Sequence, residues 1–375
     1  MPWKEVTTMS EKKRFIELTQ VEGADMSALC RTFGISRKTG YKLISRYQQE
    51  GLAGLMDRSR KPHLIHQTPP ETENLVLSIR HQHSAWGGEK IRQYLQNQGY
   101  DQLPTEKTID RILKRHGLIT AEESEKHTAW KRFEHENPND LWQMDFKGYF
   151  LAGSERCYPL TLLDDHSRFS LSIKACANQT TETVKNQLIY LFRRYGMPKR
   201  MTMDNGTPWG YSGTQMHTKL TAWLIRLGIY VSHSRPNHPQ TQGKLERFHR
   251  TLKLELLSRF SFGNLDEAQE GFDWWQRIYN EERPHGALEL AVPLQRYKKS
   301  ERDYPEEPPA ITYEDGLIIR KVQQKGYIFF KGKIFRIGEA FYGQPVGLKE
   351  TEDGQLDVYY CAQKINQIDL RYPYR

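Results

Sequence analysis

The stretch with the clearest chemical content in this sequence is HPQTQGKLERFHRTLK, from His238 to Lys253. Its proline and glycine indicate a loop, and the apolar residues after the glycine recur with the period of an α-helix. On such a helix Glu246, Arg250 and Lys253 share one face, because they are four and then three residues apart. A carboxylate with cations above it suits a site that holds metal ions beside a phosphate backbone. A solvated surface helix with an ion pair between Glu246 and Arg250 is the competing interpretation.

Two aspartates upstream favour the first interpretation. Asp145 lies inside an expected strand, Asp140–Phe150, between apolar residues, where a charge is costly unless it is paired or bound to a metal. Asp204 follows a short expected strand, Arg200–Met203, and open α/β sheets bind their ligands at the carboxyl ends of strands. Alone, the Asp-Asn-Gly that begins at Asp204 is more typical of a turn.

The order of the elements around these acids predicts the fold. We expect strands at Tyr158–Leu163 and Phe169–Ala175, a helix at Thr180–Tyr195, a helix at Gly213–Leu227 and a strand at Ile229–Ser232. Asp164 and Asp165 lie at the turn between the first two of these strands. Aspartate is a common turn former, so we interpret both as structural, with a direct catalytic role as the alternative. Three strands followed by alternating helices and strands is the layout of an α/β ribonuclease H-like fold.

The N-terminal residues predict a helix-turn-helix unit. Helices are expected at residues 10–20, Met26–Phe33 and Ser36–Gln49, with a glycine-containing turn before the last helix. The start of that helix carries the side chains that would reach bases and phosphates: Arg37, Lys38, Thr39, Tyr41 and Lys42. An ordinary three-helix bundle with a basic face is the alternative.

A second helical unit is expected after a linker at residues 56–70. Its helices are Glu71–His81, Gly88–Gln98 and a third that begins at Thr105 and carries Lys107 and Arg111. We interpret this region as a second, all-α unit of the helix-turn-helix kind. Residues 121–139 are expected to be a helical or loose connector to the middle of the chain.

The C-terminal third changes from helix to strand. A helix is expected over Leu265–Glu282, with Trp274 and Trp275 in the core, and YPEEPP at Tyr304–Pro309 indicates a linker. Five short strands follow, at Leu317–Val322, Tyr327–Phe330, Lys333–Ile337, Pro345–Glu350 and Leu356–Tyr360. Short strands at this spacing predict a small β-barrel, which could contact DNA or another protomer.

Composition limits the classes of function. The 375 residues carry a formal net charge of +9, which favours polyanionic partners, although ribosomal or membrane-surface roles fit the charge equally well. The four cysteines form no CxxC pair, which argues against a cysteine zinc site and a disulfide scaffold. No apolar run approaches the roughly 20 residues that span a bilayer, and the N-terminus lacks the apolar core of a signal peptide. We therefore expect a cytoplasmic protein, associated with the nucleoid when it is bound to DNA.

Together these residues resemble the insertion-sequence transposases of the DDE, retroviral-integrase-like superfamily. The resemblance is carried by Trp142-x-x-Asp145, Asp204-Asn205-Gly206, Pro239-Gln240-Thr241-Gln242-Gly243-x-x-Glu246, Lys253 and Tyr279-Asn280-x-x-Arg283-Pro284-His285. It covers nearly the whole chain. It implies that Asp145, Asp204 and Glu246 form a catalytic, metal-binding triad for two Mg2+ ions, with Mn2+ as a substitute.

The resemblance also implies the activity: cleavage of a mobile element at its terminal inverted repeats and transfer of the freed strand into double-stranded target DNA. Lys244, Arg250 and Lys253 would contact DNA phosphates, and His249 could be a packing, phosphate-binding or catalytic group. Synapsis of two ends implies a homodimer or higher oligomer. A DNA-binding regulator with an inactive integrase-like domain and a nuclease without strand joining are the rival functions. The expected domains are a helix-turn-helix domain at 1–60, a second helical domain with linkers at 61–135, an integrase catalytic domain at 136–303 and a β-barrel at 310–375.

Overall fold

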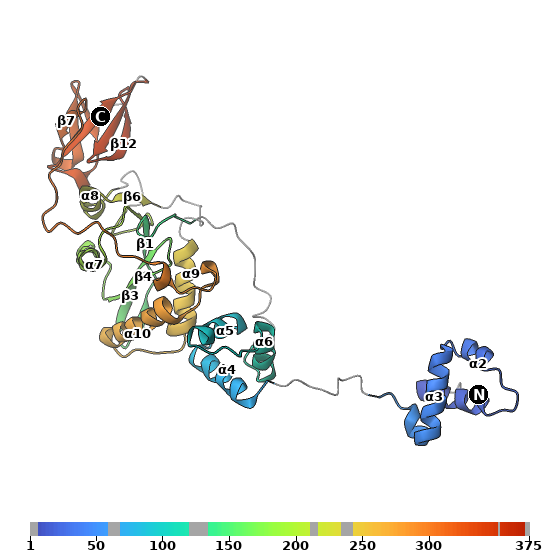
Figure 1. Ribbon diagram of the computed structural model, residues 1–375. Coiled ribbons are helices and arrows are strands. Elements are labelled where there is room, and N and C mark those ends of the chain that lie inside the picture. Colours follow the sequence, from blue (N-terminus) through green and yellow to red (C-terminus); the bar gives the residue numbers. More distant parts are fainter. Residues whose placement is uncertain are drawn as a thin grey trace. The chain divides into compact units, whose positions relative to one another are not determined.

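Figure 1 shows the computed structural model of the chain, coloured along the sequence. The structure describes residues 7–58, 68–119, 134–210, 217–233 and 243–371, apart from residue 352. The expected linker at 56–70, the connector at 121–139 and the start of the His238–Lys253 stretch lie wholly or partly outside the described residues. The chain divides into two compact units, residues 1–67 and 68–375. Within the described residues, no helix is both long enough and apolar enough to cross a membrane.

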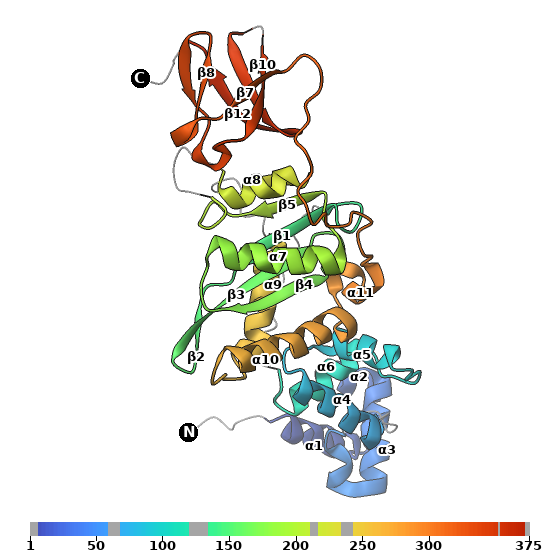
Figure 2. The same cartoon turned by 90° about the vertical axis from the view of Figure 1, so that its left-hand side faces the viewer.

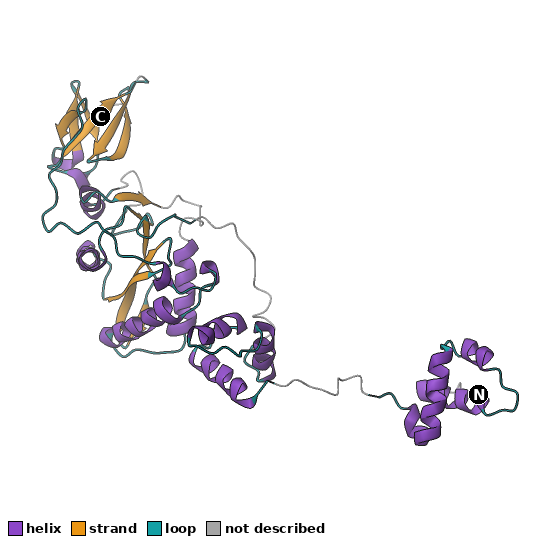
Figure 3. Ribbon diagram, viewed as in Figure 1, coloured by secondary structure: helices purple, strands orange, loops and turns teal. Residues whose placement is uncertain are grey.

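The first unit consists of helices, as the sequence predicts (Figure 3). Its elements are α1 (Thr8–Thr19), α2 (Met26–Thr32), α3 (Arg37–Glu50) and a 3-10 turn at Gly51–Leu55. Gly34 follows α2 with a positive φ of 62°, which suits glycine, and the Ser36 hydroxyl caps α3 by accepting a hydrogen bond from the Thr39 N–H at 3.1 Å. Gly40 lets α3 approach α2 closely, because an added Cβ would lie 2.8 Å from Cys30 Sγ. The expected short helix, glycine turn and second helix are confirmed.

Three further helices begin the second unit: α4 (Pro70–Gln82), α5 (Gly88–Asn97) and α6 (Glu106–Arg115). Their core contains the fully buried Trp86 and also receives Ile278, a residue about 160 positions later in the same unit. The Arg259 guanidinium donates a hydrogen bond to the carbonyl oxygen of Gln82 at 3.0 Å. These helices are therefore packed on the domain that follows them.

A mixed sheet forms the middle of the second unit. Its strands are β1 (Leu141–Phe146), β2 (Phe150–Ala152), β3 (Glu155–Asp164), β4 (Ser170–Cys176), β5 (Arg200–Met203) and β6 (Tyr230–His233). β3 pairs antiparallel with β1, β2 and β4, whereas β5 is parallel to both β1 and β6. This is the expected order of strands. The single strand expected over Asp140–Phe150 is wrong, because the chain turns after Phe146, where Gly148 takes a positive φ of 36°.

Helices cover both faces of this sheet (Figures 1 and 2). α7 (Thr181–Tyr195) and α8 (Lys219–Arg226) lie on one face, and α9 (Gly243–Leu252) and α10 (Leu265–Arg277) on the other; α9 and α10 continue into π-helical turns at Lys253–Leu257 and Ile278–Glu282. Side chains alternate along a strand, so Trp142, Met144 and Phe146 of β1 share the core with α7 and α8. Leu163 of β3 belongs to the other core, with α9 and α10.

A buried ion pair joins the two π-helical turns. Glu255 accepts a hydrogen bond from Arg283 Nε at 3.0 Å, and both side chains are buried. Asn280 binds the edge of β4: its Oδ1 accepts from the Ser170 N–H at 2.8 Å and its Nδ2 donates to the Ser170 carbonyl at 2.9 Å. The Tyr-Asn-x-x-Arg-Pro-His motif thus connects α9, α10 and the sheet.

The two adjacent tryptophans of α10 have different surroundings. Trp275 is buried, and its Nε1–H donates to Glu255 at 3.2 Å. Trp274 is 42% exposed and meets the ring of Phe260 edge-on. The expectation that both belong to the core is wrong for Trp274, because neighbouring helix positions point about 100° apart.

The C-terminal strands form two sheets. β7 (Ile318–Lys321), β10 (Pro345–Glu350), β11 (Gln355–Tyr360) and β12 (Gln363–Asp369) pair in the order β12–β11–β10–β7, and β8 (Tyr327–Phe330) pairs with β9 (Lys333–Arg336). The sequence analysis missed β12, whose polar residues hide its strand pattern. Among the described residues, no strand pairing closes the two sheets into one barrel. Gln363 connects this region to the central sheet. Its Oε1 accepts a hydrogen bond from the Val231 N–H of β6 at 2.9 Å, and its Nε2 donates to the Val231 carbonyl oxygen at 2.8 Å.

We expect Asn280→Ala to lower the free energy of unfolding by about 1–3 kcal/mol, because the buried Ser170 N–H loses its acceptor. Gln276 still donates to the Ser170 carbonyl, so that group stays paired. Chemical denaturation of the full chain measures the change. The control is Glu281→Ala, an exposed neighbour in the same motif, which should change stability by less than about 0.5 kcal/mol. Equal stability of the two variants would contradict the assigned role of Asn280.

Candidate active site

Asp145 faces α9 because of the alternation along β1. Its neighbours Met144 and Phe146 belong to the core under α7 and α8, so the side chain between them points to the opposite face. The carbonyl oxygen of Asp145 accepts a hydrogen bond from Thr161 Oγ1 on β3 at 2.8 Å. Asp145 is therefore held on the face of the sheet that α9 covers.

Asp204 lies beside Asp145 because β1 and β5 are parallel neighbours. The register pairs Gln143 with Thr202, and the same step two residues later puts Asp145 opposite Asp204. Adjacent strands are about 4.8 Å apart, so two aspartates distant in the sequence become neighbours. Asp204 also stands at the carboxyl end of β5, as the sequence predicts.

The turn after β5 fixes the Asp204 carboxylate. Its Oδ1 accepts hydrogen bonds from the Gly206 N–H at 3.0 Å and from Trp209 Nε1. The Trp209 ring is buried and stacks on Phe146, with ring centroids 5.4 Å apart. The sequence analysis did not single out Trp209. The sequence signal that could have identified it is an aromatic side chain with an N–H donor, five residues after Asp204.

Glu246 projects from α9, near enough to Asp145 for its charge to act on that carboxyl. The apolar positions of α9 are buried as predicted, and Glu246 is exposed. His249, three residues later, bonds through Nε2 to Thr161 Oγ1 at 2.7 Å. Because that hydroxyl donates to the Asp145 carbonyl, the His249 ring donates from Nε2. Arg250, one turn later, is also exposed, and the ion pairs of the described residues do not include Glu246 with Arg250.

The negative charges of Asp204 and Glu246 act on the Asp145 carboxyl. The pKa of Asp145 is raised to about 7, first by burial and then by the negative charges of Asp204 and Glu246. A donor set made only of carboxylate oxygens suits a hard divalent ion such as Mg2+. Within the described residues, however, no three His, Cys, Asp or Glu side chains are close enough to hold one ion. The donor chemistry fits a metal ion, but the spacing does not form a complete ligand set.

Basic side chains follow the carboxylates closely along the chain. Arg250 is exposed on α9, and Lys253 is exposed at the start of the π-helical turn that continues it. Burial and the nearby Lys253 lower the pKa of Lys147, which follows Asp145 by two residues. Lys147 is a basic residue that the sequence analysis did not assign to the site. Its place so soon after Asp145 is the signal that could have identified it.

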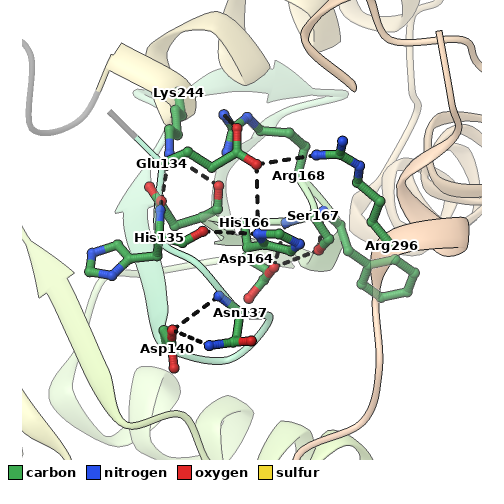
Figure 4. A network of polar contacts seen from close by, with 12 residues as sticks. Glu134, His135, Asn137, Asp140, Asp164, His166, Ser167, Arg168, Lys244 and Arg296 are labelled. Atoms are coloured by element: carbon green, nitrogen blue, oxygen red, sulfur yellow. Dashed lines mark hydrogen bonds and ion pairs between the residues drawn. The ribbon is translucent and has the colours of Figure 1, made fainter. Parts of the chain in front are cut away.

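Asp164 belongs to the turn between β3 and β4, as we interpreted it (Figure 4). Its Oδ1 accepts from the Ser167 N–H at 2.8 Å, and its Oδ2 accepts from the Asn139 N–H at 2.7 Å. The carboxylate is fully buried. These hydrogen bonds account for the buried Asp164 carboxylate as a structural group of the turn.

Lys244 differs from the other basic residues of α9. Its Nζ donates to Asp165 Oδ2 at 2.5 Å, and the two side chains are 17% and 3% exposed. Its contact with DNA therefore stays a prediction about a lysine that already has a protein partner. Sequence reasoning treated Asp165 only as a turn residue and so missed this contact.

The residues expected to contact DNA in the helical units lie on the surface. These side chains are exposed on α3 (Arg37, Lys38, Thr39, Tyr41 and Lys42) and on α6 (Lys107 and Arg111). Leu43, Ile44 and Tyr47 of α3 pack on the core of the first unit instead. Each helix thus presents one face inward and a basic face to solvent.

Comparison with models of protein families identifies known domains in this chain. Residues 135–239 and 227–293 match two models described as integrase core domains, and residues 318–373 match the C-terminal domain of IS481 family transposases. Residues 11–63 match a helix-turn-helix domain and residues 39–113 a homeodomain-like domain. These matches place integrase core domains in the middle of the chain, helix-turn-helix and homeodomain-like domains before them and a transposase C-terminal domain after them.

Individual relatives confirm the resemblance to insertion-sequence transposases. An uncharacterized 31.7 kDa protein of insertion element IS407 from Burkholderia multivorans is 24% identical, over 61% of this chain and 83% of its own length. The transposase of transposon Tn552 from Staphylococcus aureus is 25% identical, over 88% of this chain and 77% of its own. The HTLV-2 integrase catalytic core domain in complex with magnesium superposes with a TM-score of 0.35, at 15% identity, over 44% of this chain and 99% of that one.

His249 gives a prediction about pH. Burial, with a smaller effect of Lys147, lowers its pKa to about 3, so between about pH 6.5 and 3 the unfolded chain binds a proton that the folded chain does not. Stability therefore falls as the pH is lowered through this range. His249→Asn should make that fall shallower, by up to about 1.4 kcal/mol per pH unit. Urea denaturation at several pH values measures the slope, with exposed His81→Asn as the control. A slope identical to that of the wild type would rule out the buried, neutral His249.

Proposed function

We propose that the protein is a DNA transposase that binds the terminal inverted repeats of a mobile element, cleaves its ends and joins them to target DNA. The observation that supports this most strongly is the arrangement of Asp145, Asp204 and Glu246. They come from β1, the end of β5 and α9, on one face of the central sheet, and burial together with the charges of the other two raises the pKa of Asp145. The helix-turn-helix domains and the transposase-type C-terminal domain support DNA as the substrate.

Two Mg2+ ions are the proposed cofactors, with Mn2+ as a substitute. Two divalent ions about 3.5–4 Å apart activate an oxygen nucleophile and stabilise the attacking and leaving oxygens of a phosphodiester. Asp145 would hold both ions, with Asp204 and Glu246 holding one each. Because Glu246 is exposed, its side chain has the rotamer freedom to turn towards the two aspartates. No covalent protein–DNA intermediate is needed, so no serine or tyrosine nucleophile is assigned.

The basic residues would bind the DNA backbone around this site. Arg250 shares α9 with Glu246, Lys253 begins the π-helical turn that continues this helix, and both side chains are exposed to an approaching phosphate. Lys147, two residues after Asp145 and near Lys253, adds a third basic residue. Arg37 and its neighbours on α3, with Lys107 and Arg111 on α6, would read the element ends. Two ends must be held together for joining, so we propose that a homodimer or larger assembly acts on them.

We also propose the domain limits at 1–60, 61–135, 136–303 and 310–375, with the last as a small β-barrel. Support for the barrel comes from its interior: Phe330 and Phe335 of the β8–β9 pair share one core with Val346 and Val358 of the larger sheet. In the assembled complex, the barrel would contact DNA or another protomer.

The deciding assay uses purified protein, Mg2+, a labelled element end and a target plasmid. Strand joining is the result expected of a transposase. Nicking without joining would favour the nuclease, and tight binding without cleavage would favour the regulator.

Within that assay, Asp145→Asn, Asp204→Asn and Glu246→Gln should each reduce cleavage and joining at least about a thousandfold, because the ion ligands carry the charge stabilisation. Binding to the end should stay nearly intact, since the helical units are unchanged. Glu270→Gln, an exposed carboxylate on α10, is the matched control and should stay active. Full activity of any one triad variant would falsify the assignment of that residue.

Replacing Arg37 and Lys38 by Ala should weaken end binding and flatten its salt dependence. Each lost phosphate contact lowers the slope of log K against log salt by about 0.9. Fluorescence anisotropy with an end duplex at several salt concentrations measures both effects. Lys13→Ala, an exposed lysine on α1, serves as the control. Unaltered affinity in the double variant would move end recognition away from the start of α3.

A further inference from the structure

Asp165 makes contacts that its place in a turn does not require. The residue is 2% exposed, and its Oδ1 accepts a hydrogen bond from Gln143 Nε2 on β1 at 2.8 Å. Its Oδ2 accepts from the backbone N–H of His135 at 3.0 Å and from Lys244 Nζ at 2.5 Å. Lys244 Nζ also lies 3.1 Å from the Asp165 carbonyl oxygen. One carboxylate thus connects β1, the chain that enters β1 and the first turn of α9.

The chain that enters β1 is held at the same turn by a second set of bonds (Figure 4). Glu134 accepts hydrogen bonds from Arg168 Nη2 and from Arg296 Nη1, each at 3.2 Å. Arg296 ends α11 (Pro293–Arg296), a short helix that the sequence analysis missed. His166 Nδ1 lies 2.9 Å from the carbonyl oxygen of His135. The turn between β3 and β4 is therefore a fixed point to which α9 can be tied.

Stability alone does not explain the pair of Asp165 and Lys244. Burying two opposite charges costs about as much free energy as their attraction returns, and a well-packed apolar pair would serve equally well. α9 is already held to the sheet by Leu245, Phe248 and Leu252, all of them buried. An ion pair adds a fixed direction to this packing, because it joins two specific atoms.

The direction matters because apolar packing by itself permits α9 to roll about its own axis, and the His249–Thr161 bond holds the helix at one polar point only, one turn after Glu246. Lys244 and Glu246 are two residues apart, so they leave the helix about 200° apart, on either side of the buried Leu245. A roll that separates Lys244 from Asp165 also swings Glu246 relative to the two aspartates. The ion pair between Lys244 and Asp165, on one side of Leu245, therefore opposes the displacement of Glu246 on the other side.

We propose that Asp165 and Lys244 are positioning residues, whose buried ion pair sets the rotation of α9 and with it the place of Glu246 beside Asp145 and Asp204. The inference rests on the proposed function for the role of Glu246. It gives Lys244 a different task from the DNA contact that the sequence suggested.

The test compares Lys244→Met, Lys244→Arg and Asp165→Asn in the full chain with an end duplex present. Direct titration with Mn2+, followed by the electron paramagnetic resonance of the free ion, gives a readout that does not depend on the reaction. Lys244→Met and Asp165→Asn should each raise the Kd for Mn2+ about tenfold or more, and Lys244→Arg should stay within about threefold. A double variant with both Lys244→Met and Asp165→Asn should bind Mn2+ no more weakly than either single variant. The reason is that all three variants lack the same ion pair.

Lys253→Met is the matched contrast, since it removes an exposed lysine from the same helix. It should weaken DNA binding and flatten its salt dependence, with the Kd for Mn2+ unchanged. Thermal unfolding of every variant shows whether that variant is folded. A folded variant with weaker Mn2+ binding indicates a rotated helix, and the lack of an unfolding transition indicates a lost fold. If Lys244→Met does not fold, Asp165→Asn, which keeps the shape of its side chain, decides the question.

Wild-type affinity for Mn2+ in a folded Lys244→Met or Asp165→Asn variant overturns the positioning role. A Lys244→Met variant that loses only DNA binding overturns it too, because Lys244 is then a phosphate ligand. Failure of the proposed function looks different: the wild type binds Mn2+ but neither cleaves nor joins DNA. In that case the metal titrations still decide whether the ion pair places Glu246.

Discussion

The parallel pairing of β1 with β5 is the constraint on which the candidate site depends. Hydrogen bonds between the two strands fix a register in which Gln143 faces Thr202, and the same register brings Asp145 and Asp204 together. Alternation along β1 then decides the face, because the apolar neighbours of Asp145 fill the core under α7 and α8. A slip of one residue would turn Asp145 into that core and leave an apolar side chain in its place.

The third carboxylate is placed less rigidly than the first two. Glu246 belongs to a helix that meets the sheet through apolar side chains, through the His249–Thr161 bond and through the Lys244–Asp165 pair. The two aspartates follow from backbone hydrogen bonds, whereas the glutamate follows from side-chain contacts that a ligand can alter. This difference fits the proposed metal site, in which Glu246 would complete the ligand set when DNA and ions bind.

The buried polar contacts of the second unit join segments that are far apart in the sequence. Glu255 and Arg283 connect the ends of α9 and α10, Ile278 enters the core of α4–α6, and Gln363 bonds the edge strand β6. The Tyr-Asn-x-x-Arg-Pro-His motif accordingly connects α9, α10 and β4, and Ile278, the residue just before it, packs against α4–α6.

The sequence by itself determined most helices and strands, because apolar periodicity, caps and glycine turns are local signals. Ser36, Gly34 and Thr105 mark their elements where expected. It also singled out Asp145, Asp204 and Glu246, through motif residues that resemble those of transposases. The tertiary structure alone decided that Asp165 meets Lys244, that Trp209 holds Asp204 and that Asn280 pairs with Ser170. Each of these contacts depends on the register and packing of distant segments, and no local pattern of residue types records them. The break after Phe146 and the strand β12 were missed for a related reason, since their pairing partners rather than their own composition define them.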